Sequence, residues 1–181
     1  MTDTQVKQAM AIADIIHAEI QRSGSFIEAL TDYSHAFARN QKFDALRGEK
    51  MIRDTYTAAH GQTLNQTRVG LETAEENLPD TAKTRALDCA ESIGPLIQAA
   101  PTQPFYKVYD RAAVTLSAEF GITQNAAKAM MKDAFELRHS RDLYTHGKEI
   151  EEANHKPTRD AEIEARKAES SQTRSQSRSM D

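Results

Sequence analysis

Apolar residues recur every three to four positions along most of this chain, and this spacing constrains the fold more than any other feature of the sequence. It places them on one face of an α-helix, whereas a half-buried strand would require strict alternation. Turn residues are scarce, because the 181 residues include only 7 Gly and 5 Pro, too few to connect a many-stranded sheet. The sequence therefore predicts an all-α fold, a multi-helix bundle of about seven helices.

Glycines and short polar motifs predict where these helices begin and end. Three glycines follow apolar stripes, as expected of residues that close a helix in the left-handed conformation: Gly24, Gly61 and Gly121. Two pairs have the spacing of a capping box, in which side chains satisfy the free backbone N–H groups of the first turn: Ser25 with Glu28, and Thr63 with Gln66. The stripe expected in the seventh helix is Ala127, Met130, Met131, Ala134 and Leu137.

Prolines and charge suggest how the chain is divided. Three of the five prolines fall within residues 94–104, and a proline in a helix interior removes a backbone hydrogen bond. We therefore expect the helix that begins near Asp80 to end at Ile93, with a hinge or a long connection after it. Residues 1–148 are expected to form the helical domain. Residues 149–181 should form a charged helical extension and then a disordered tail, because SSQTRSQSRSMD offers almost nothing to bury.

Cysteine content and charge limit the compartment and the ligands. Cys89 is the only cysteine, so no intrachain disulfide can form, and it is expected to be a small buried side chain. The chain has neither a signal-peptide pattern nor an apolar run of about 18 residues, which predicts a cytoplasmic protein without membrane insertion. A net charge of −4 argues against non-specific wrapping of nucleic acid. The six histidines form no metal-binding motif, so no metal or other cofactor is expected.

The segment from Leu116 to Lys132 resembles the helix-turn-helix of Cro-like phage repressors. The small residue Ser117 precedes Gly121 by four positions, and the apolar Ile122 follows the glycine, as in that motif. The resemblance implies that the second helix enters a DNA groove, and an ordinary pair of capped helices is the alternative. The side chains then expected to contact bases or phosphates are Thr123, Gln124, Asn125, Lys128 and Lys132, with Lys107 and Arg111 on the DNA backbone.

Arg141 and His146 enclose the residues DLYT, and this spacing resembles the Arg-x4–6-His signature of HEPN ribonucleases, which are all-helical. In that family the histidine takes part in acid–base chemistry at the RNA 2′-hydroxyl, the arginine stabilises phosphate charge, and a polar residue such as Asp142 follows the arginine. The resemblance implies RNA cleavage by Arg141 and His146 in an assembly of two subunits. A solvated, charged helix face is the alternative interpretation.

The C-terminal residues carry a third pattern. Arg166, Arg174 and Arg178 resemble the C-terminal arginine signal of substrates of Agrobacterium-type IV secretion systems, in which arginines recur after a seven-residue gap and then at alternate positions. Gln176 stands where that pattern has another arginine. The resemblance implies translocation through such a system, and the alternative is a solvated tail with scattered charge.

Two longer stretches, FIEALTDYSHAFARNQKFDALRGEKMIRD and HGKEIEEANHKPTRDAEIEARKAES, resemble uncharacterised helical proteins encoded on conjugative plasmids of rhizobia and agrobacteria. This resemblance implies a mobile-element context and assigns no catalytic residue. The leading interpretation is a non-enzymatic helical binding protein of a plasmid or other mobile element. Its partner is expected to be DNA or a protein of conjugation or secretion, and the sequence leaves open whether the chain forms a homo-oligomer.

Overall fold

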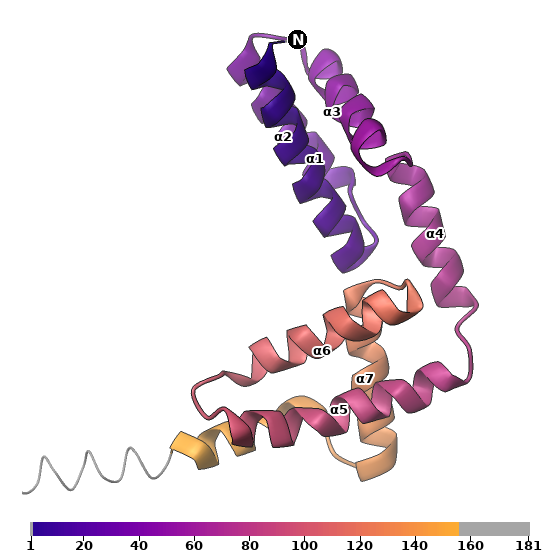
Figure 1. The fold of residues 1–181 in the computed structure, drawn as a ribbon, viewed down its shortest axis with the longest axis vertical. Coiled ribbons are helices and arrows are strands. Elements are labelled where there is room, and N and C mark those ends of the chain that lie inside the picture. Colours follow the sequence, from indigo (N-terminus) through magenta and orange to yellow (C-terminus); the bar gives the residue numbers. More distant parts are fainter. Residues whose placement is uncertain (1, 156–181) are drawn as a thin grey trace, which may run out of the picture.

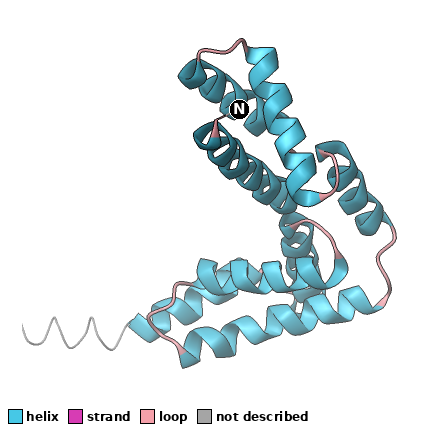
Figure 2. Ribbon diagram, turned by 45° about the horizontal axis from the view of Figure 1, so that its top comes forward, coloured by secondary structure: helices cyan, strands magenta, loops and turns pink. Residues whose placement is uncertain are grey.

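The structure is a computed structural model of the chain and describes residues 2–155. All regular secondary structure in that range is helical, which confirms the predicted all-α fold (Figures 1 and 2). The helices are α1 (Asp3–Ser23), α2 (Ile27–Gln41), α3 (Ala45–His60), α4 (Leu64–Glu76), α5 (Thr81–Ala99), α6 (Phe105–Phe120) and α7 (Gln124–His139), followed by a last helical segment at residues 143–155. The tail arginines Arg166, Arg174 and Arg178 lie outside the described residues.

Glycine caps occur where the sequence predicts them. Gly24, Gly61 and Gly121 have φ values of 75°, 70° and 66° and close α1, α3 and α6 in the left-handed conformation. The capping box of Thr63 and Gln66 is also present at the start of α4. These ends depend on neighbours within a few residues, so local sequence is enough to define them.

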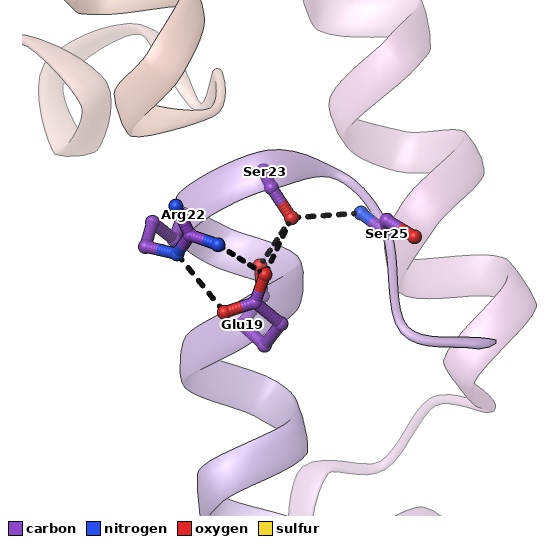
Figure 3. Close-up of polar contacts among 4 residues, drawn as sticks. All are labelled: Glu19, Arg22, Ser23 and Ser25. Carbon is purple, nitrogen blue, oxygen red and sulfur yellow. Dashed lines mark hydrogen bonds and ion pairs between the residues drawn. The ribbon is translucent and has the colours of Figure 1, made fainter. Parts of the chain in front are cut away.

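The capping box predicted for Ser25 and Glu28 is wrong. Helix α2 begins after Phe26, and no side chain caps it. The Ser25 backbone N–H instead donates to Ser23 Oγ at 3.3 Å, within the polar contacts that close the end of α1 (Figure 3). Phe26 is buried in the core. We infer that its burial sets the start of α2 in place of a polar cap.

The expected hinge at residues 94–104 is also wrong in its first half. Helix α5 continues through Pro95 to Ala99, so the connection to α6 is confined to residues 100–104. Pro95 removes one backbone hydrogen bond, but Ile93 and Ile97 on either side of it are buried. The burial of these two side chains offsets the missing bond, because each contributes about 1.5–3 kcal/mol.

The buried apolar side chains form two separate clusters. The first, in α1–α4, includes Ile16, Ile20, Phe37, Ile52, Tyr56 and Leu71, and we call these helices the N-terminal unit. The second, from α5 to residue 155, includes Ile93, Ile97, Phe105, Leu116, Met131 and Phe135, and we call it the C-terminal unit. Figure 1 shows α1–α3 gathered above, α5–α7 below, and α4 running between them. Ala74 and Leu78, near the end of α4, pack on the second cluster, so α4 joins the two units.

The last helical segment packs on the C-terminal unit beyond the expected domain limit at residue 148. Leu143 is buried, and Ile150 packs against the second cluster. Asn154 Nδ2 donates to the Ile97 carbonyl of α5 at 3.1 Å. Gly147 lies against the ring of Phe105, where an added Cβ would overlap the ring. Part of the predicted charged extension is therefore helical and held to α5 and α6.

Candidate functional site

Thr123, the first residue of the predicted DNA-reading set, is held between the two units. Its side chain is buried, with only 6% of the residue exposed. The Thr123 N–H and hydroxyl both donate to Glu75 Oε1 of α4, at 2.9 and 2.6 Å. Its Oγ1 accepts from the Ala126 N–H at 3.1 Å and so caps α7. With these partners Thr123 has no free polar group to offer to a DNA base.

Lys128, one turn further along α7, is engaged by α6. Its ammonium pairs with Asp110 at 2.6 Å and lies 5.8 Å from the centre of the Tyr109 ring. The Tyr109 hydroxyl donates to the Lys128 carbonyl at 2.9 Å. Burial, assisted by the nearby carboxylates of Asp110, Asp142 and Asp133, raises the pKa of Tyr109 to about 12. The surface around Lys128 is therefore acidic as much as basic.

The other residues of the DNA-reading set differ in exposure. Gln124 is half-buried, whereas Asn125 and Lys132 of α7 and Lys107 and Arg111 of α6 are exposed. The turn itself also occurs elsewhere in the fold, since Gly61 and Thr63 join α3 to α4 as Gly121 and Thr123 join α6 to α7. A Gly-x-Thr turn is thus a general way to connect two helices here, and DNA recognition by this segment stays a prediction.

Near His146 lies His139, which the sequence did not single out, together with its partner Glu91. His139 Nε2 is 2.8 Å from Glu91 Oε1 of α5. The ring of Phe135 packs against both imidazoles, with its centre 4.4 Å from that of His139 and 5.3 Å from that of His146. Glu91 and His139 are 48 residues apart in the chain, so no spacing in the sequence could link them.

The setting of His146 favours its neutral form. Burial lowers the pKa of His146, and the positive charges of Arg141 and His139 lower it further. Its Nδ1 is buried and has no hydrogen-bond partner among the described residues. Arg141 is paired with Glu149 of the last helical segment. A neutral imidazole can act as a base, but here one of its nitrogens faces the interior and the guanidinium is already paired.

A groove between α5 and α7 is lined by residues of the predicted stripe of α7. Its volume is about 610 Å³. Leu137 lines it and is 88% exposed, the highest value among the large apolar side chains of residues 2–155. The expectation that Leu137 is buried is therefore wrong, because α7 turns Ala127, Met131 and Phe135 toward the core instead. The remaining lining residues are Lys83, Thr84, Leu87, Met130, Asp133, Ala134 and Arg138.

Cys89 is buried, as predicted, and burial raises the pKa of its thiol. Within residues 2–155, no three His, Cys, Asp or Glu side chains come close enough together to hold a metal ion. No helix in the described part of the chain has the length and apolar character needed to cross a bilayer.

Comparisons with protein-family models, with curated proteins and with solved structures returned no match for this chain.

Proposed function

We propose that this chain is a non-enzymatic helical binding protein of a plasmid or other mobile element, and that the groove between α5 and α7 binds an amphipathic helix of a protein partner. The observation that carries the proposal is the exposure of Leu137 at the edge of an apolar groove. The mobile-element context is supported by the sequence resemblance alone.

The groove has the spacing of a helix-binding surface. Met130, Ala134 and Leu137 are separated by four and three residues and so lie on one side of α7. Leu87 of α5, which is half-buried, forms the opposite wall. Covering an exposed leucine contributes about 1.5–3 kcal/mol, so Leu137 can act as the main apolar anchor of a complex. Amphipathic helices commonly bind grooves of this kind through anchors at the same intervals.

The charges at the edge of the groove indicate the partner's chemistry. Lys83 and Arg138 are basic and Asp133 is acidic, which leaves one net positive charge. None of the three forms an ion pair with another described residue. A partner helix with acidic residues beside its apolar anchors would therefore gain more than a basic one.

Two fluorescently labelled peptides test this proposal. Each has about 16 residues, a length at which designed helices form in water. Both carry leucines at the spacing of the groove, and their flanking residues are glutamate in one and lysine in the other. Fluorescence anisotropy with the full chain should show tighter binding of the glutamate peptide. Leu137→Asp should abolish this binding. The control Leu46→Asp should not, because Leu46 is 80% exposed on α3 but does not line the groove.

Three outcomes would overturn the proposal. These are no binding of either peptide, equal binding of both, and loss of binding in the Leu46 variant. Sedimentation of the free protein tests whether a second copy of the chain occupies the groove. If the protein is a dimer and Leu137→Asp converts it to a monomer, the groove serves self-association. DNA is a weaker candidate for this chain because Thr123 is buried and Lys128 is paired.

The ribonuclease interpretation remains a second candidate, favoured by the grouping of His139 and Glu91 with His146 and Arg141. An imidazole can serve as general acid or base in RNA cleavage, and a guanidinium can bind the phosphate. Purified protein should then cleave total RNA, and His146→Ala should remove that activity. Equal cleavage by the wild type and the variant would exclude this candidate, since a contaminating nuclease would account for it.

A further inference from the structure

A directed chain of hydrogen bonds crosses the N-terminal unit. His17 Nδ1 of α1 lies 2.9 Å from the Tyr56 hydroxyl of α3, which donates to Thr67 Oγ1 of α4 at 3.0 Å. Thr67 in turn donates to the carbonyl of Thr63 at 3.2 Å. A carbonyl can only accept, so every hydroxyl proton in the chain points toward Thr63. His17 must therefore donate from Nδ1, and α1, α3 and α4 are joined through the buried side chain of Tyr56.

A second imidazole lies directly against this chain. The rings of His17 and His60 are stacked with their centres 4.2 Å apart and their planes 8° from parallel. His60 Nε2 is buried, has no hydrogen-bond partner in the described part of the chain, and lies 3.6 Å from Asp14 Oδ1. One proton on His60 would be balanced by Asp14. A second proton, on His17, would place two positive charges face to face at the stacking distance.

The groups that face this pair come from three helices. Helix α1 contributes Asp14, α3 contributes the Tyr56 hydroxyl, and α4 contributes the neutral Thr67. Burial lowers the pKa of His17, the charge of His60 lowers it further, and Asp14 acts in the opposite direction. The folded state thus binds fewer protons at His17 than the unfolded chain does, and stability falls as the pH falls through the ordinary histidine range.

Two of the three helices joined by the hydrogen-bond chain, α1 and α4, also contact the C-terminal unit at the start of α7. Gly24 closes α1, and a Cβ added there would lie 3.4 Å from Thr123 Cγ2. Glu75 near the end of α4 accepts both hydrogen bonds from Thr123. Figure 3 shows that the end of α1 is closed by contacts of Glu19 with Arg22 and Ser23. Thr123 therefore lies against the end of α1 and the end of α4 at the same time.

We propose that the stacked His17 and His60 form a pH-sensitive contact that controls the joint between the two units. With both rings neutral, the chain through Tyr56 holds α1 and α4 together, and Gly24 and Glu75 enclose Thr123. Protonation of both rings separates α1 from α3 and weakens the attachment of α7 to α4. The inference concerns the joint and does not depend on what the α5–α7 groove binds.

Hydrogen exchange of the full chain tests the proposal at about pH 7.5 and about pH 5, on either side of the ordinary histidine pKa. After correction for intrinsic exchange rates, protection of the Thr123 and Ala126 amides should fall about tenfold or more at the lower pH in the wild type. His60→Gln, which removes the second imidazole of the stacked pair, should keep its protection. The control His35→Gln, at an exposed position on α2, should behave like the wild type.

The variants also separate this effect from a direct effect of pH on Glu75, because that effect would be equal in wild type and His60→Gln. The same loss of protection in both proteins would therefore overturn the proposal. Asp14→Asn provides a second test at an exposed site, where folding is not at risk. Without the balancing carboxylate, protection at about pH 5 should fall further than in the wild type. Unchanged protection in this variant would contradict the proposal.

Discussion

Glu75 of α4 accepts hydrogen bonds from both the backbone N–H and the hydroxyl of Thr123, so a carboxylate from one unit binds the N-cap residue of a helix in the other. The two residues are 48 positions apart in the chain. Helix α7 therefore begins where it does through a contact between the units as well as through its own threonine cap. The position of Thr123 also explains why the turn before α7 is buried rather than presented to a ligand.

Glu75→Ala should lower the free energy of unfolding by about 1–2 kcal/mol, because it leaves two donors of Thr123 without their acceptor. Urea unfolding measures this change. The matched control is Glu72→Ala on the same helix, where the carboxylate pairs only with Arg68 on the surface and its loss should cost less than about 0.5 kcal/mol. Equal losses in the two variants would contradict the importance of the Thr123 contact.

Gly147→Ala should destabilise the protein by about 3 kcal/mol, because the added Cβ would overlap the buried ring of Phe105. Gly70→Ala is the matched control, since Gly70 also lies in a helix but an added Cβ there meets no atom within 4 Å. That substitution should stabilise the protein by about 0.5–1 kcal/mol through the better helix propensity of alanine. Thermal unfolding of both variants gives the comparison, and a tolerated alanine at 147 would contradict the described packing.

Tyr109 should ionise with a pKa of about 12, later than an exposed tyrosine. Because its pKa is raised in the folded state, its contribution to stability is present below about pH 10 and is lost as the pH rises toward the folded value. Absorbance titration of tyrosinate should show a late component that Tyr109→Phe removes. If the phenylalanine variant retains that component, the environment assigned to Tyr109 is wrong.

The sequence predicted those parts of the fold that depend on near neighbours. Gly24, Gly61 and the Thr63 cap need only a few adjacent residues, and each was located correctly. A local rule also predicts that the helix ends before Pro95, and that prediction is wrong. Burial of Ile93 and Ile97 keeps α5 helical through the proline. At this position side-chain packing outweighs the low helix propensity of proline, and packing cannot be read from a single sequence.

The candidate sites depend on pairings that helical periodicity cannot reveal. Leu137 falls on the predicted apolar stripe of α7, yet it is exposed. Packing against α5 and α6 determines which residues of the stripe face the core. His139 joins Glu91, and His17 joins Tyr56, across 48 and 39 positions of the chain. Spacing within one helix can suggest a candidate site residue, but its neighbours depend on how the helices are arranged.

Binding of a helical partner in the α5–α7 groove is tested by mapping where the acidic amphipathic peptide contacts the protein. Amide chemical shifts of the full chain should be followed by NMR as the peptide is added. The largest changes should fall on Lys83, Leu87, Met130 and Leu137 in the α5–α7 groove, and Leu137→Asp should remove them. Changes that fall elsewhere on the chain, or that persist in this variant, would contradict binding in this groove.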